Sequence, residues 1–186
     1  MSETVESERL ILRRWREQDL APMAAINADP EVMRWIEGGQ VMSERETADE
    51  ISVLEERWAE RGFGLFAVED KDSGRLAGFA GLSIPKFLPE LLPAVAVGSR
   101  FGRDFWGRGY ATEALNSALW FGFEQCGMQR IVSTHQIANA AADRCALKLG
   151  MSRVKEIICP GCGAEMYVYE IFKEDFTWTG ARVRES

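Results

Sequence analysis

The sequence has little of several features that would place it in a special class of protein. It has one histidine and four cysteines in 186 residues, and no internal repeat or low-complexity segment. No apolar run approaches the ~18 residues that a membrane-spanning helix needs. The acidic N-terminal ten residues also lack the apolar segment of a secretory signal. These absences argue against a membrane protein and a disulfide scaffold, and they predict a cytoplasmic protein with reduced thiols.

What remains is the composition of an ordinary globular enzyme or binding domain. Apolar residues make up 46% of the chain and charged residues 27%, enough to build a full hydrophobic core without metal or disulfide staples. The length favours one domain. We expect that domain over residues 1–176 and a loose tail over 177–186.

The charge is distributed unevenly between the two halves of the chain. The net charge is −7, which makes nucleic acid an unfavourable partner. Residues 1–93 carry 19 acidic and 11 basic side chains, whereas residues 94–186 carry 10 and 11. The first half would therefore attract cations and the second could tolerate an anion, although solvated helix faces give the same asymmetry.

Hydrophobic periodicity and helix-capping signals predict alternating helices and strands. Strands are expected over 9–15, 64–69, 75–84, 95–98, 130–135, 154–159 and 166–172, and helices over 17–28, 30–37, 44–62, 109–126 and 139–149. This order predicts a mixed α/β (α+β) domain, with one central sheet of about seven strands flanked by helices. The strand–helix–strand unit over 95–135 should be a parallel crossover.

The segment 106–114, Trp-Gly-Arg-Gly-Tyr-Ala-Thr-Glu-Ala, lies between a predicted strand and a predicted helix. Gly107 and Gly109 allow successive backbone N–H groups to point inward, and the helix start adds free N–H groups and a positive dipole. Together they would form an anion cradle for a phosphate or pyrophosphate. A Gly-x-Gly pair is also found in ordinary tight turns. The segment is neither a Walker loop nor a dinucleotide fingerprint.

Two motifs together resemble a known family. Residues 106–114 are similar to the acetyl-CoA pyrophosphate loop of the GNAT acetyltransferase superfamily, in its RimJ/RimL-type subgroup of ribosomal-protein N-terminal acetyltransferases. Residues 139–151, Asn-Ala-Ala-Ala-Asp-Arg-Cys-Ala-Leu-Lys-Leu-Gly-Met, resemble the subgroup's second motif. The resemblance covers about residues 8–176 and implies the single GNAT-like domain described above.

The resemblance implies acetyl transfer from acetyl-CoA, as cosubstrate, to an amine. The strand at 100–102 would pair with the pantetheine arm, and the amide of Phe101 or Gly102 would polarise the thioester carbonyl. Asn139 would bind the pantetheine arm and Arg144 would reach the phosphates. The expected cofactor-binding residues are Arg100, Phe101, Gly102, Gly107, Arg108, Gly109, Tyr110, Ala111, Thr112, Asn139 and Arg144.

The catalytic residues are less well marked, because the chain departs from the family pattern. Alanine occupies three positions, 96, 142 and 146, where many relatives have a polar or acidic group. His135, the only histidine, can accept a proton near neutral pH and is the expected proton acceptor, with Glu165 and Glu156 as reserves. With Phe101 as the carbonyl-polarising group, the expected catalytic set is His135, Phe101 and Glu165. A strand-end histidine without a catalytic role is the alternative for His135.

Several functions fit these observations. The acceptor would be the α-amino group of a protein or peptide, or a small amine such as a polyamine or antibiotic, and a catalytically degenerate acetyl-CoA sensor is a further alternative. Met33 and Trp35 could line the acceptor pocket. Cys159 and Cys162 make half a zinc site without a second pair, so no metal is expected. We expect no membrane or nucleic-acid partner, and a monomer or homodimer.

Overall fold

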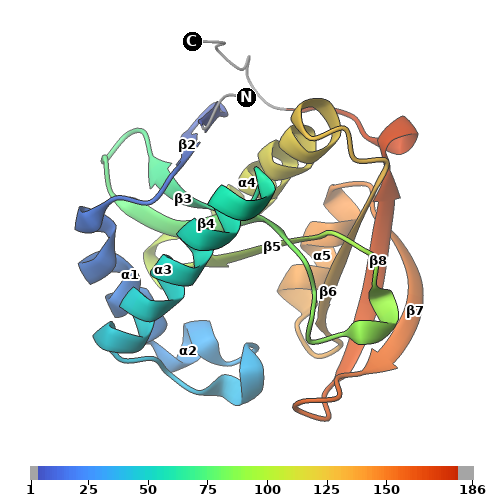
Figure 1. Ribbon diagram of the computed structural model, residues 1–186, viewed down its shortest axis with the longest axis horizontal. Coiled ribbons are helices and arrows are strands. Elements are labelled where there is room, and N and C mark those ends of the chain that lie inside the picture. The colour runs from blue at the N-terminus through green and yellow to red at the C-terminus, as the bar shows by residue number, and fades with distance from the viewer. Residues whose placement is uncertain (1–3, 180–186) are drawn as a thin grey trace.

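A computed structural model describes residues 4–179, and its core is one eight-stranded sheet (Figure 1). The strand order is β1-β2-β3-β4-β5-β6-β8-β7. All neighbours are antiparallel except β5 and β6, which are parallel. The strands are β1 (Val5–Glu6), β2 (Leu10–Arg13), β3 (Leu65–Asp70), β4 (Leu76–Ser83), β5 (Ala96–Phe101), β6 (Arg130–Gln136), β7 (Ser152–Ile158) and β8 (Glu165–Phe172).

Five α-helices connect these strands, and their starts follow the capping signals in the sequence. Ser43 and Glu46 form a capping box at α3, and the Asp29 side chain accepts the Glu31 N–H at α2. The helices are α1 (Leu20–Asn27), α2 (Pro30–Met33), α3 (Glu44–Arg61), α4 (Tyr110–Trp120) and α5 (Ala140–Lys148). In Figure 1, α1 and α2 lie at the β2–β4 end of the sheet, and α5 lies at the β6–β8 end.

The mixed sheet and its parallel crossover are confirmed, and the differences from expectation are local. The two-residue strand β1 was missed and brings the strand count to eight. The helix expected over 17–28 begins as a 3₁₀ turn, Glu17–Asp19, and the one expected over 109–126 ends in a π-helical turn, Phe121–Gln125. The tail is also packed at its start, because the Trp178 ring contacts Trp120 and the Thr179 N–H donates to Asn116 Oδ1. Residues 180–186 lie outside the described part.

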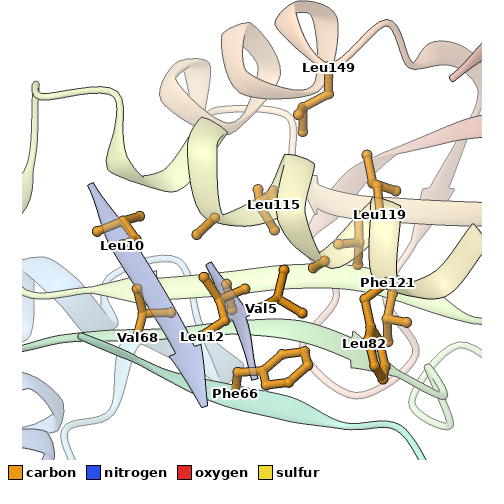
Figure 2. Packing of buried hydrophobic residues seen from close by; sticks show 14 of the residues in the cluster. Val5, Leu10, Leu12, Phe66, Val68, Leu82, Leu115, Leu119, Phe121 and Leu149 are labelled. Carbon is orange, nitrogen blue, oxygen red and sulfur yellow. The ribbon is translucent and has the colours of Figure 1, made fainter. Parts of the chain in front are cut away.

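The two faces of the sheet pack mainly against different helices. The face that we call the α4 face carries apolar side chains from strands β2–β4 that pack against Leu115 and Leu119 of α4 (Figure 2). On the opposite face, which we call the α3 face, Phe79 and Ala67 pack with Ile26 of α1 and with Leu54 of α3. Because strand side chains alternate between faces, the face of each site residue can be assigned from these contacts.

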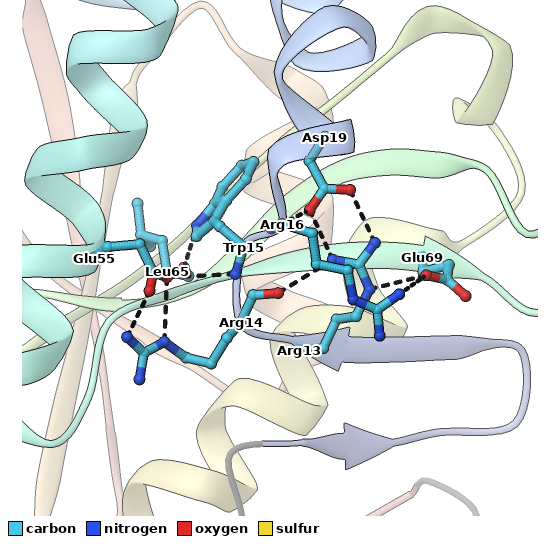
Figure 3. Close-up of polar contacts among 8 residues, drawn as sticks. All are labelled: Arg13, Arg14, Trp15, Arg16, Asp19, Glu55, Leu65 and Glu69. Atoms are coloured by element: carbon cyan, nitrogen blue, oxygen red, sulfur yellow. Dashed lines mark hydrogen bonds and ion pairs between the residues drawn. The ribbon is translucent and has the colours of Figure 1, made fainter.

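Arginines on β2 and in the loop after it fasten the N-terminal helices to the sheet (Figure 3). Arg13 is buried and bonds to Asp19, at 2.7 Å, and to Glu69 on β3, at 2.8 Å. Arg14 pairs with Glu55 of α3 at 2.5 Å. The buried Arg13–Asp19 pair fixes the start of α1 on the sheet, because a buried charge must keep its partner, and the partly exposed Arg14–Glu55 pair adds a link to α3.

The parallel strands β5 and β6 diverge almost at once. They share a single paired position, Ala96 with Val132, beside a hydrogen bond from the Val132 N–H to the Val95 carbonyl. Beyond that position β5 pairs only with β4, and β6 only with β8. We call the opening between them the β5–β6 gap, and the candidate site is built around it.

Candidate active site

The edge of β5 that borders the β5–β6 gap presents unpaired backbone groups. The Gly102 N–H donates to the Ala77 carbonyl at 2.9 Å, toward β4. Since strand backbone groups alternate in direction, the N–H groups of Ser99 and Phe101 point the other way, into the gap. The Phe101 carbonyl accepts the indole N–H of Trp106 at 2.8 Å. Within the described part of the chain, the N–H groups of Ser99 and Phe101 therefore remain as free donors on this edge for an extended, amide-containing ligand.

The backbone directions along β5 distinguish the three expected cofactor-binding residues at positions 100–102. Gly102 uses its N–H toward β4, so of the two expected carbonyl-polarising amides only Phe101 keeps a free N–H. The Arg100 carbonyl points at β4, because a Cβ on Gly78 would lie 2.0 Å from it. The Arg100 side chain lies on the α3 face, bonded to Asn27. The Gly102 N–H and the Arg100 carbonyl thus face β4 and not the gap, and the expected cofactor contacts of these two residues remain predictions.

The predicted anion cradle has the backbone that it requires. Gly107 and Gly109 have φ values of 73° and 79°, a region that favours glycine. Gly109 is the N-cap of α4, and no side chain caps the helix. The Glu113 N–H is bonded to the Gly109 carbonyl at 3.0 Å, so the N–H groups of residues 110–112 have no carbonyl partner within the helix. Three N–H groups at the positive end of the helix dipole suit a pyrophosphate.

Arg9, a residue that the sequence did not single out for this role, holds the anion cradle in place. Its guanidinium bonds to Glu113 at 2.7 Å and to the Arg108 carbonyl at 2.8 Å. Ser7 donates a second bond to Glu113 at 2.7 Å. The Tyr110 side chain is buried and donates to Asp70, which leaves only its backbone N–H for a ligand. Contacts between residues about a hundred positions apart leave no local signal in a sequence.

The second motif forms α5, which lies beside α4. Asn139 caps the helix through Oδ1, which accepts the Ala142 N–H at 3.2 Å, so its Nδ2 group is left as a donor. Arg144 is exposed. Thr112 and Cys145 meet at 3.3 Å between the two helices, and burial raises the pKa of the Cys145 thiol. The expected roles of Asn139 and Arg144 remain predictions.

His135 lies on the α4 face of β6, in an aromatic pocket. Its ring stacks on the Tyr169 ring, with 5.3 Å between the ring centroids, and packs edge-on against the Tyr167 ring, with 6.1 Å between the centroids. Its Nε2 atom is buried and has no hydrogen-bond partner among residues 4–179. It lies 3.7 Å from Asp143 Oδ1, which also accepts the Tyr169 hydroxyl. Burial lowers the pKa of His135, while Asp143 acts in the opposite direction. Burial and Asp143 raise the pKa of Tyr169 to about 12.

The remaining candidates lie at the far end of the sheet. Glu165 and Glu156 are exposed on β8 and the edge strand β7. Cys159 is buried and Cys162 is exposed in the turn that joins these strands. Over residues 4–179 no group of three or more metal-ligating side chains comes together. None of the helices described there is long and apolar enough to cross a membrane.

A free strand edge followed directly by an anion cradle is the arrangement that the family comparison explains. Residues 9–152 match the family model described as "Acetyltransferase (GNAT) domain". The chain belongs to the GNAT acetyltransferase family. It is accordingly an acetyl-CoA-dependent N-acetyltransferase, and the match includes both motifs identified in the sequence.

Curated relatives extend over nearly the whole chain. YkkB of Bacillus subtilis, an uncharacterized protein, is 29% identical over 152 residues, which cover 81% of this chain and 86% of the relative. YnaD of the same organism, an uncharacterized N-acetyltransferase, is 27% identical over 176 residues, which cover 92% and 98%.

Solved structures share the fold. A GNAT-family acetyltransferase from Bacillus anthracis superposes with a TM-score of 0.76 at 24% identity, covering 92% of this chain and 99% of that one. The ribosomal L7/L12 α-N-protein acetyltransferase RimL, in complex with coenzyme A, gives 0.74 at 16% identity, covering 91% and 98%. At these identities the likeness concerns the fold alone.

The anion cradle gives a first prediction. Replacing Gly109 with Val forces a branched side chain onto a backbone with φ of 79°, and should raise the dissociation constant for acetyl-CoA at least about tenfold. Calorimetry measures it. Gly163→Val imposes similar strain, at φ of 69° with open space around it, and should leave binding unchanged. Binding by Gly109→Val within twofold of wild type would place the phosphates elsewhere.

The buried histidine gives a second prediction. Because the pKa of His135 is lowered in the folded state, the unfolded chain binds the proton more readily, and stability should fall as the pH drops from about 7.5 to about 5.5. Urea unfolding measures this fall, which should be smaller in His135→Gln. Equal falls in both proteins would mean that another group causes the dependence.

Proposed function

We propose that this enzyme transfers an acetyl group from acetyl-CoA to the α-amino group of a protein or peptide. The observation that carries the proposal is the continuity between the free β5 edge, at Ser99 and Phe101, and the anion cradle at residues 107–112. A strand edge and a phosphate site in sequence suit a ligand with an amide-containing arm and a pyrophosphate.

The free N–H of Phe101 is the proposed carbonyl-polarising donor. Bound acetyl-CoA would supply an acetyl group already activated as a thioester. A backbone N–H fixed by the sheet stabilises charge on a carbonyl oxygen without reorganising, and one such donor is worth roughly 3–4 kcal/mol in comparable sites. The Trp106 indole holds the neighbouring Phe101 carbonyl, which helps to fix the peptide unit that follows Phe101.

The choice of an α-amine rests on proton affinity. An α-amine of pKa about 8 costs about 1–1.5 kcal/mol to deprotonate at neutral pH, whereas a lysine-like amine of pKa about 10.4 costs about 4–5 kcal/mol. Alanine at 96, 142 and 146 leaves few polar groups to assist, so the amine with the lower pKa is favoured. RimL, named as an α-N-protein acetyltransferase, has the same fold.

His135 is the proposed proton acceptor, directly or through water, with Glu165 as the alternative. Its lowered pKa keeps the imidazole neutral near pH 7 and able to accept a proton. Asp143, 3.7 Å away, would stabilise the imidazolium once formed. Because Nε2 is enclosed, a proton from the β5–β6 gap would reach it through water or Asp143.

The proposal is tested by measuring thiol release from acetyl-CoA with three acceptors. These are a peptide with a free N-terminus, an N-acetylated peptide containing lysine, and spermidine. The free N-terminus should give the highest kcat/KM, at least about tenfold above the others. Faster acetylation of spermidine would contradict the α-amine proposal, and binding of acetyl-CoA without turnover on any amine would indicate a sensor.

The same assay tests the proton acceptor. His135→Gln should lower kcat/KM about a hundredfold and remove an acid limb that lies below about pH 6.5 in the wild type. Glu165→Gln serves as the comparison variant. Unchanged kcat/KM and an unchanged acid limb in His135→Gln would remove His135 from the mechanism.

A further inference from the structure

Open space, which we call the recess, lies next to Gly98 of β5 on the α3 face. Gly98 stands between the buried residues Ala96 and Arg100 but is itself partly exposed, and a Cβ built on it would meet no atom within 4 Å. This side of Gly98 is the α3 face, because Arg100, two residues on, contacts Phe79 there. The recess therefore opens beside the β5–β6 gap, on the face opposite His135.

A buried polar network lies beside this recess. The Arg100 side chain is 8% exposed, and its Nη1 donates to Asn27 Oδ1 at 2.6 Å and to Glu50 Oε2 at 3.2 Å. Asn27, which is fully buried, donates to the same Glu50 oxygen at 3.1 Å and to Thr47 at 3.1 Å. One residue of α1 and one of β5 thus converge on a single carboxylate oxygen of Glu50 in α3.

Two polar atoms of this network have no hydrogen-bond partner among the described residues. Glu50 Oε1 accepts no hydrogen bond from any residue in the described range 4–179, and the Glu50 side chain is 25% exposed. Arg100 Nε is buried with no partner there. A carboxylate held through one oxygen by two buried donors, with its other oxygen free, is a preorganised acceptor for a cation.

Resting on the proposed function, we propose that Glu50 is the acceptor-recognition residue, and that its free oxygen binds the ammonium group of the incoming amine. The recess at Gly98 would admit that amine toward the β5–β6 gap. Arg100 and Asn27 act as positioning residues, since both hold Glu50 through its other oxygen, Oε2.

The charge of the substrate would make Glu50 bind the substrate in preference to the product. An amine with pKa about 8 arrives mostly as an ammonium ion, and a partly buried carboxylate attracts it more strongly than a solvated one does. Arg100, 3.2 Å from the other Glu50 oxygen, offsets part of this attraction. The acetylated product is an uncharged amide and forms no ion pair with Glu50. Glu50 would therefore favour substrate over product.

The test compares binding of two peptides in the presence of coenzyme A, by calorimetry. One peptide has a free N-terminal alanine and otherwise uncharged side chains, and the other is its des-amino analogue. Wild type should bind the ammonium peptide at least about tenfold more tightly, and Glu50→Gln should lose that preference. Glu50→Asp, which keeps the charge, should retain part of it. Glu56→Gln, on an exposed position of the same helix, should behave as wild type.

The kinetic counterpart separates this proposal from the function on which it rests. Glu50→Gln should raise KM for the peptide about tenfold while kcat changes less than about threefold, with the KM for acetyl-CoA unchanged. Equal binding of the two peptides by wild type, or an undiminished preference in Glu50→Gln, would overturn the role of Glu50. Acetylation of no acceptor by wild type would overturn the proposed function, while the calorimetry still tests the recess.

Discussion

The architecture of this enzyme depends on the early separation of two parallel strands. A parallel pair inside a sheet normally satisfies its backbone groups along its whole length, yet β5 and β6 share one paired position. The sheet tolerates this because β5 is paired along its length with β4, and β6 with β8. The unpaired N–H groups at Ser99 and Phe101 are therefore available to a ligand.

The elements around the β5–β6 gap divide its chemistry between two faces. The α4 face carries the anion cradle at the start of α4, together with His135 and Asp143. The α3 face carries the recess at Gly98 and the network of Arg100, Asn27 and Glu50. In the proposed function the acetyl donor occupies the gap, and the amine approaches it from the α3 face. The acidic first half of the chain supplies the helices α1 and α3 that cover that face.

Local features of this site were predictable from the sequence, and long-range ones were not. Gly107, Gly109 and the Asn139 cap act within a few residues of their own positions, so the sequence alone is enough to recognise them. The contact of Arg9 with Glu113 joins positions 104 residues apart, and that of Arg100 with Asn27 joins positions 73 apart. The sequence predicted Arg100 as a cofactor-binding residue. Its side chain instead lies on the α3 face, where it bonds to Asn27, and a contact over this distance could not be predicted from the sequence. Strand β1 was not predicted, because a strand of two residues is too short to show a periodic pattern.

The central claim is that the free edge of β5 receives the acetyl donor. Amide hydrogen exchange, resolved by residue with and without acetyl-CoA, tests it most directly. The account predicts that acetyl-CoA slows exchange at Ser99 and Phe101 at least about tenfold, while Gly102, already bonded to Ala77, changes little. Unchanged exchange at Ser99 and Phe101 under saturating acetyl-CoA would contradict it.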